Sequence, residues 1–245
     1  MIDQGTQRDE HRTRIVEVAG RMLREQGVAA VTTRAVAEGA GVQAPTIYRL
    51  FGDKDGLLEA VAEQAMTAFA AEKAQAVRAA RDEHADPVDD LRAGWAMTIG
   101  FGLDNPDLFV LLNDPERGRR SAAARAGTAL LAERVRRVAE AGRLAVSERR
   151  AVDLVHAAGT GAVLAILAAP ADERDPGLAD DALGAVLDRI LVPDPVGPTD
   201  RDQPGRGAVT SAAITLRAVA DDLDVLSVGE RAVLAEWLDR VIDPR

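Results

Sequence analysis

The chain has 245 residues, 47% of them hydrophobic, so it can bury one large core or two smaller ones. It contains no cysteine, which excludes disulfides, thiolate metal sites and cysteine catalysis and is compatible with a reducing cytosol. The formal net charge is −10. Residues 1–55 are neutral, with eight basic and eight acidic residues, so all the excess charge lies beyond them. This balance argues against nucleic-acid binding through bulk charge.

Residues 32–58 predict two short helices, a glycine turn between them and the start of a long third helix. Thr32 is expected to cap the first helix, because its hydroxyl can accept a hydrogen bond from an unpaired backbone N–H. Gly41 would end that helix, since glycine adopts the left-handed backbone of such a turn. Pro45 suits the first turn of the second helix. The apolar side of this second helix consists of Ile47, Leu50 and Phe51.

The other side of the second helix is compact and polar. It consists of Gln43, Ala44, Thr46, Tyr48 and Arg49. A short helix with such a face, supported by a partner helix, has the geometry of a recognition helix that enters the DNA major groove. The pattern therefore predicts a helix-turn-helix DNA-binding domain over residues 1–55.

The order and spacing of these residues closely resemble the tetracycline-repressor family of helix-turn-helix transcription regulators. The matching positions are Thr32, Thr33, Arg34, Ala37, Gly41, Val42, Pro45, Thr46, Tyr48, Phe51, Lys54 and Leu57. The resemblance covers roughly residues 12–62, including an apolar helix at residues 15–23. The rest of the chain is similar to the family only in length and helical character.

The resemblance implies two kinds of DNA contact. Base edges would be contacted by Arg34, Gln43, Ala44 and Pro45. Phosphates would be bound by Thr33, Thr46, Tyr48 and Lys54, beside the outward-facing Arg49. Arginine can bond bidentately to guanine and glutamine to adenine, whereas a lysine at a helix N-terminus strengthens the attraction of that end for phosphate. Two alternatives stay open: Tyr48 packs against the following helix, or Arg34 is an ordinary solvated side chain.

Two positions depart from the family pattern. Leu50 stands where the family often has a histidine or another polar group, so a phosphate contact there is lost. Gly39 lies near the end of the first motif helix. Because glycine costs about 0.5–1 kcal/mol in a helix interior, we expect this helix to fray.

The remaining chain is expected to be helical, without strand alternation or internal repeats. A long helix is predicted over residues 53–81. Asp86-Pro87 and Asn105-Pro106 each pair a capping residue with a first-turn proline and so open two further helices. Ser147 would cap a helix rich in alanine and glycine that ends near residue 169, and another helix is predicted over residues 178–191.

The resemblance implies that residues 56–192 form an effector-binding and dimerisation domain. By position, the helices at 147–169 and 178–191 would form a four-helix dimer interface. The small residues that would permit close approach are Ala157, Ala158, Gly161, Ala162 and Ala165. A tight core within one subunit is the alternative. A dimer also follows from function, because a two-fold axis places two recognition helices about 34–36 Å apart, one turn of DNA.

The predicted effector pocket lies among the helices between residues 57 and 169. Its candidate lining is Trp95, Thr98, Phe101, Phe109, Leu112, Thr128 and His156. Pockets are mostly apolar with a few polar groups, and a plain hydrophobic core has the same composition. His156 also fits a hydrogen-bonded core or interface residue. The stretch 154–171 lacks charged residues and approaches the length of a membrane span, but its histidine, glycines and alanines favour a packed soluble helix.

The C-terminal part begins with residues 193–207, whose four prolines and three glycines predict a flexible linker. Residues 208–245 follow as a helical extension. Ser227 and Glu230 form a capping-box pattern there. The apolar stripe of the last helix, which would dock on the body or on a second subunit, is Leu234, Trp237, Leu238 and Val241.

Together these features predict an all-α, cytoplasmic homodimer that binds a palindromic double-stranded DNA operator and responds to an unknown small-molecule effector. Repression is what the resemblance implies by default. No catalytic residue, metal, cofactor or membrane partner is expected. The alternatives are the same fold controlled by a protein partner or by no effector, an enzyme, and a helical interaction protein that does not bind DNA. The enzyme is disfavoured because the three histidines are scattered and no phosphate loop or GxSxG motif is present.

Overall fold

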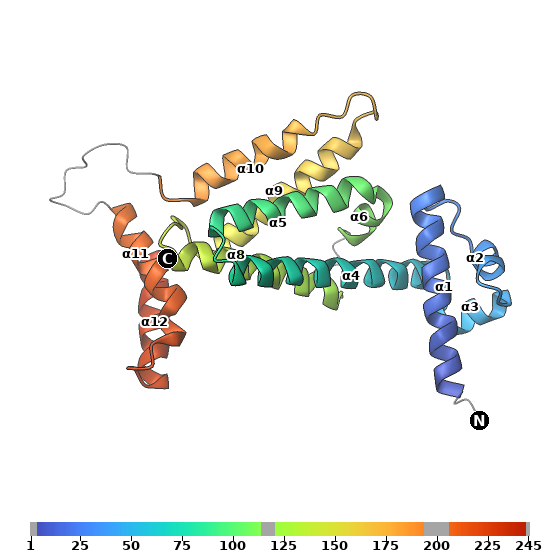
Figure 1. The fold of residues 1–245 in the computed structure, drawn as a ribbon, viewed down its shortest axis with the longest axis horizontal. Helices are drawn as coiled ribbons and strands as arrows, with labels where there is room; N and C mark the ends of the chain where they lie inside the picture. The colour runs from blue at the N-terminus through green and yellow to red at the C-terminus, as the bar shows by residue number, and fades with distance from the viewer. Residues whose placement is uncertain (1–3, 114–120, 194–205, 244–245) are drawn as a thin grey trace. The chain divides into compact units, whose positions relative to one another are not determined.

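The computed structural model describes residues 4–113, 121–193 and 206–243 (Figure 1). The elements of these residues are helices, with one isolated antiparallel bridge between Leu144 and Leu191. The all-α fold class is thereby confirmed. The chain divides into two compact units, residues 1–74 with 100–127 and residues 75–99 with 128–245. Each unit is assembled from two segments that are separate in the sequence.

The first unit is built around the N-terminal helices. It contains α1 (Gln4–Gln26), α2 (Thr33–Gly39), α3 (Ala44–Phe51), α6 (Pro106–Leu112) and parts of α4 (Lys54–Asp82), α5 (Pro87–Asp104) and α8 (Ala122–Glu140). Its core consists of buried aliphatic side chains. Those at most 2% exposed include Ile15, Val36, Ile47, Leu57 and Leu108. The core of the helix-turn-helix therefore extends past residue 55 into α4 and α6.

The second unit contains the rest of α4, α5 and α8, followed by the C-terminal helices. These are α9 (Glu148–Ala168), α10 (Gly177–Ile190), α11 (Arg206–Val219), the 3-10 turn η1 (Ala220–Asp222) and α12 (Val228–Ile242). Two pairs lie side by side, α9 with α10 and α11 with α12 (Figure 1). Leu91, Val135, Val163, Ile190 and Ile214 are buried in its core.

Capping residues act at most of the predicted helix starts. The Ser147 hydroxyl accepts from the N–H of Arg150 at 3.3 Å, and Ser227 with Glu230 forms both bonds of a capping box. Asn105 is an exception. Its amide nitrogen donates 3.1 Å to the Phe101 carbonyl, so it binds the end of α5 instead of capping α6.

Asp86 caps α5, and its capping hydrogen bonds affect the pKa of its carboxyl group. Its Oδ1 accepts from the N–H groups of Val88 at 2.9 Å and Asp89 at 3.2 Å. Burial raises the pKa of Asp86, but these N–H groups and the Arg143 guanidinium outweigh it and lower the pKa below its ordinary value. The cap therefore stabilises α5 most when Asp86 is ionised.

The C-terminal extension differs in burial between its two helices. Residues 194–205, most of the predicted linker, lie outside the described residues, and α11 begins at Arg206. Ile214 on α11 is 2% exposed, whereas no residue of α12 is buried. Leu234 and Leu238 are half-buried, and Trp237 is 60% exposed.

One described helix, α9, is long and apolar enough to cross a membrane by length and composition, and 33% of its apolar window is buried. The core helices of soluble proteins pass the same test.

Candidate functional site

The turn between α2 and α3 holds the two helices in a fixed arrangement. The Thr32 hydroxyl accepts from the Ala35 N–H at 3.1 Å and starts α2, as predicted. Gly41 has φ +64°, the left-handed conformation predicted for this turn. The Val42 N–H then donates to the Ala37 carbonyl at 2.9 Å. Ile47 is fully buried and fixes α3 on this support, so the opposite side of α3 faces outward.

The outward side of α3 presents the predicted recognition residues. Gln43, Pro45, Tyr48 and Arg49 are exposed, while Ala44 and Thr46 are half-buried. The Tyr48 ring is 54% exposed, so it is not part of a core. Its hydroxyl lies 3.3 Å from the Thr33 hydroxyl, which joins the start of α2 to α3. Two predicted phosphate-binding groups are thus adjacent in space.

Three basic side chains accompany this surface. Arg34 on α2 and Arg49 on α3 are exposed, and the described residues offer neither of them an ion pair or a hydrogen-bond partner. Lys54 begins α4, and its ammonium donates 3.2 Å to the Val28 carbonyl. Because an ammonium has three donors, two remain for an outside acceptor.

Two supports of this region were not predicted from the sequence. The Arg12 guanidinium on α1 lies 5.0 Å from the centroid of the Phe51 ring at the end of α3. Asp107 on α6 accepts from the Val28 N–H at 2.9 Å and so holds the loop between α1 and α2. The sequence carries no signal for the second contact, because its partners are 79 residues apart.

The predicted pocket residues are distributed over both compact units. Phe101, Phe109 and Leu112 belong to the first unit, and Trp95, Thr98, Thr128 and His156 to the second. Phe101 stacks on Phe69 with 4.3 Å between ring centroids, and Phe109 is buried in the same unit. Trp95 is buried, whereas Thr128 and His156 are exposed. Because His156 is exposed, it does not belong to the core of the second unit.

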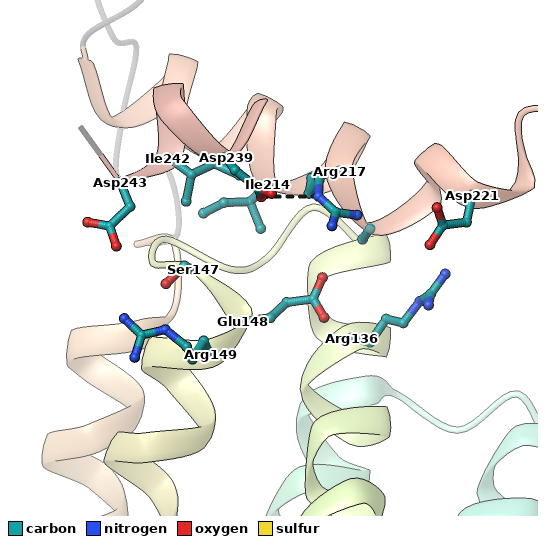
Figure 2. Close-up of a pocket in the computed structure, with 11 residues that line it drawn as sticks. Arg136, Ser147, Glu148, Arg149, Ile214, Arg217, Asp221, Asp239, Ile242 and Asp243 are labelled. Carbon is teal, nitrogen blue, oxygen red and sulfur yellow. Dashed lines mark hydrogen bonds and ion pairs between the residues drawn. The ribbon is translucent and has the colours of Figure 1, made fainter. Parts of the chain in front are cut away.

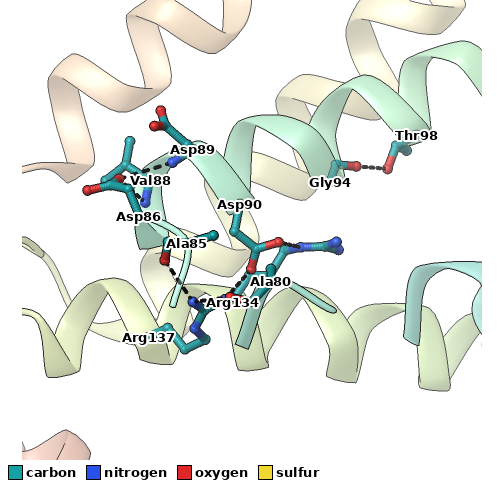
Figure 3. Close-up of polar contacts among 10 residues, drawn as sticks. All are labelled: Ala80, Ala85, Asp86, Val88, Asp89, Asp90, Gly94, Thr98, Arg134 and Arg137. Atoms are coloured by element: carbon teal, nitrogen blue, oxygen red, sulfur yellow. Dashed lines mark hydrogen bonds and ion pairs between the residues drawn. The ribbon is translucent and has the colours of Figure 1, made fainter. Parts of the chain in front are cut away.

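A buried polar cluster on α5 and α8, shown in Figure 3, was also missed from the sequence. Asp90 accepts from Arg134 Nε at 3.1 Å and from Arg137 Nη1 at 2.7 Å. Arg137 Nη2 also donates to the Ala85 carbonyl at 3.0 Å. The side chains of Asp90 and Arg134 are each only 2% exposed. One signal existed: Arg134 precedes the buried Val138 by four residues, so both lie on the same helix face.

A cavity of about 480 Å³ lies among α8, α9, α11 and α12 (Figure 2). None of the predicted pocket residues lines it. Arg136 and Arg217 are engaged with Glu140 and Asp239, each at 3.1 Å. Glu148 points between these two arginines. Burial raises the pKa of Glu148, and the nearby arginines only partly offset this effect.

The outer face of α9 carries most of the residues predicted for a dimer interface. Ala157, Gly161 and Ala165 are exposed, and Ala158 is half-buried. Ala162 is 6% exposed and belongs to the core of the second unit, because it lies on the opposite side of the helix with Val163 and Ile166. Leu164 extends the outer face as an apolar side chain that is 39% exposed.

Sequence comparison places residues 15–61 in the family described as bacterial regulatory proteins, tetR family. This segment contains α2, α3 and their supporting helices. No curated protein matches the chain in sequence.

Several solved structures have a similar fold, and each aligns with most of this chain. RolR in complex with resorcinol has a TM-score of 0.61 and 18% identity, covering 86% of this chain and 96% of that one. Thermus thermophilus FadR, described as a TetR family transcriptional repressor in complex with lauroyl-CoA, has a TM-score of 0.58 and 24% identity, covering 76% and 98%. A tetR family transcription regulator from Shewanella sp. PV-4 has a TM-score of 0.54 and 21% identity, covering 75% and 99%. These likenesses concern the fold. The match over residues 15–61 identifies a TetR-family helix-turn-helix segment in this chain, and the chain shares its fold with these solved structures.

Proposed function

We propose that the protein is a ligand-responsive transcription regulator that binds a palindromic operator as a homodimer in the cytoplasm. The observation that supports DNA reading best is the outward side of α3, which is exposed and polar while Ile47 on its other side is fully buried. A short helix presented in this way fits the major groove. Repression is the default that the family suggests.

The contacts follow the chemistry of each side chain. Arg34, Gln43 and the start of α3 would contact base edges, and the adjacent hydroxyls of Thr33 and Tyr48 would bind phosphate. Replacing Arg34 by alanine should cost about 1–3 kcal/mol of binding and relax the preference at one base pair, if it bonds guanine. Arg49 and the free donors of Lys54 would add phosphate contacts.

The homodimer would form through α9 and α10. The exposed Ala157, Gly161 and Ala165 let a second helix approach closely, and Leu164 supplies apolar area at the same face. A two-fold axis through this face would place two copies of α3 on successive turns of DNA.

The effector would act by a population shift. The ligand must bind the conformation that cannot bind DNA more tightly than the competent one, and its effect is limited by that difference in affinity. RolR and FadR, whose structures hold resorcinol and lauroyl-CoA, give precedent for small-molecule binding on this fold. Control by a protein partner is the alternative, and a rise in melting temperature with a small molecule favours direct ligand control.

The test is selection of bound fragments from a random duplex DNA library. Wild type, Tyr48→Ala and the control Arg21→Ala, which changes an exposed arginine of α1, are compared. We expect wild type and the control to enrich one palindromic motif and Tyr48→Ala to lose it. Recovery of a single half-site would contradict the dimer. Equal enrichment by Tyr48→Ala would contradict the assigned reading surface.

A further inference from the structure

The buried cluster on α5 and α8 has one positive charge more than it can neutralise. Asp90 is the carboxylate partner of both Arg134 and Arg137. Arg137 is further satisfied by the backbone carbonyls of Ala80 at 3.4 Å and Ala85 at 3.0 Å. No backbone carbonyl of the described residues accepts from Arg134 in this way, although its side chain is 2% exposed. Burying a charge without full compensation is costly, so this arginine needs an explanation.

The missing interaction can be located at one nitrogen of the Arg134 guanidinium. Nη2 is buried and has no hydrogen-bond partner among the described residues. The Gly94 carbonyl of α5 already accepts the Thr98 hydroxyl at 2.9 Å in addition to its helix bond, so both of its lone pairs are occupied (Figure 3).

The surrounding backbone is shaped around this guanidinium. A Cβ atom at Gly94 would lie 2.7 Å from Cζ of Arg134, so glycine is required for the guanidinium to lie against α5. Trp95, the next residue, is also buried, and its Nε1 likewise has no partner among the described residues. The two unpaired donors come from different helices, Trp95 from α5 and Arg134 from α8, so they need not meet one acceptor.

We infer that the effector of this regulator is a monocarboxylic acid whose carboxylate binds Arg134 at Nη2 in the helical body, on a different edge of the guanidinium from the Nη1 and Nε atoms that lie against Gly94. The inference rests on the proposed function and names the chemistry of its effector. A carboxylate supplies both the missing acceptor and one negative charge, which equals the excess of the cluster. A phosphate dianion would carry more negative charge than this excess. Water would satisfy the nitrogen but leave the charge uncompensated.

The experiment is calorimetric titration of the full chain, without DNA, at constant ionic strength. The probes are straight-chain carboxylates from acetate to dodecanoate and benzoate, each compared with its primary amide. The amide keeps the shape and removes the charge. We expect at least one carboxylate to bind roughly 10- to 100-fold more tightly than its amide, the factor that a hydrogen bond between charged groups supplies. Preference of less than about threefold across the whole series overturns the inference.

Two variants locate the site. Arg134→Met keeps the side-chain volume and leaves Asp90 paired with Arg137, so the ligand-free protein should melt at or above the wild-type temperature. It should bind the selected acid no better than the amide. Arg92→Met, at an exposed arginine of α5, is the control and should bind as wild type does. If Arg134→Met still prefers the acid to its amide as strongly as wild type does, the acid binds at another place and the assignment to Arg134 is wrong.

The wild-type comparison does not depend on the folding of any variant. It is also independent of the DNA selection. An operator motif without carboxylate preference contradicts this inference alone, whereas carboxylate binding without an operator motif contradicts the proposed function alone.

Discussion

Gly39 determines how closely α1 and α2 approach each other. The sequence suggested that this glycine weakens α2, but it is the last residue of the helix, and a Cβ atom there would lie 2.9 Å from Cγ1 of Val18. Val18 is buried and β-branched, so it cannot easily move away. The glycine therefore has a packing role that the pattern along the chain does not reveal.

We expect Gly39→Ala to destabilise the protein. The gain in helix propensity, about 0.5–1 kcal/mol, is outweighed by an overpacking cost of roughly 1–3 kcal/mol. Denaturant unfolding of the two proteins measures the difference. Gly100→Ala is the control, because a Cβ atom at this position of α5 meets nothing within 4 Å, and it should be stabilising. Stabilisation by both substitutions would contradict the contact with Val18.

Arg49 and Lys54 should affect DNA binding in distinguishable ways. Each removal of a phosphate contact should flatten the salt dependence of binding by about one unit per subunit. Arg49→Ala should do so without loss of stability, since the described residues offer Arg49 no partner. Lys54→Ala should also lower stability by roughly 0.5–1.5 kcal/mol, because its bond to the Val28 carbonyl is lost. Binding titrations at several salt concentrations and a melting curve separate these effects.

Glu148, which lines the cavity, should make the free energy of unfolding depend on pH. Its pKa is raised above the ordinary 4.5 by burial, against the opposing effect of Arg136 and Arg217, while Glu140 and Asp239 raise it further. Between 4.5 and the raised pKa, the folded protein holds a proton that the unfolded chain has lost. The free energy of unfolding contributed by this group therefore falls as pH rises through that window and stays reduced at pH 7.

We accordingly expect Glu148→Gln to raise the melting temperature slightly at pH 7, with the difference vanishing below pH 4. The effect should be small because half-exposed charges are screened. Asp181→Asn, at an exposed position of α10, serves as the control. A lower melting temperature of Glu148→Gln at pH 7 would show that the attraction to the two arginines prevails.

Individual residues were predictable when their partners lie within one helical turn. Thr32 and Ser147 cap as the sequence indicates, because a cap depends on the next three residues. Asp90 and Arg134 are 44 residues apart, and only the packing of α5 on α8 joins them. Charged residues are usually exposed, so the sequence did not indicate that Asp90 and Arg134 are buried.

At the scale of elements, the outer face of α9 is the part most open to test. A Cβ atom at Gly161 meets nothing within 4 Å, so a larger side chain fits within the subunit but would obstruct a second helix. We expect Gly161→Arg to convert a dimer to monomers in analytical ultracentrifugation, with circular dichroism unchanged. Gly229→Arg places the same side chain in open space on α12 and should leave the dimer intact. Dimers in both variants would exclude this face as the interface.

The positions of the helices were predicted well, because capping residues and prolines mark where most of them begin or end. The helix expected at residues 178–191 spans Gly177–Ile190, and the one expected at 53–81 spans Lys54–Asp82. The role of Asn105 was not predictable, because its side chain can bond either forward to α6 or back to α5. The side of a helix that is buried was also uncertain where small residues surround it, as for Ala162.

At the scale of the whole molecule, the division into two units could not be read from the sequence. A boundary after residue 55 follows the motif, whereas compactness joins the N-terminal helices to residues 100–127. Leu108 on α6 completes their core and is 2% exposed. The contact connects segments that no local pattern relates.

We therefore expect Leu108→Ala to destabilise the first unit by about 2–5 kcal/mol, the usual range for a buried leucine. Hydrogen exchange should show faster opening of α1 to α3, although Leu108 lies about fifty residues beyond the motif. Val110→Ala, at an exposed position of the same helix, is the control. Unchanged exchange in α1 to α3 would contradict the shared core.

The neutral N-terminal segment and the acidic remainder also affect how the regulator finds its site. Proteins slide along DNA when non-specific attraction to phosphates keeps them associated. Residues 1–55 have no net charge, and the other residues carry the ten excess negative charges, so this attraction is weak. We expect the search to proceed mainly through free diffusion, with little protein sequestered on the competing sites of a genome. A low copy number would then suffice to keep an operator occupied.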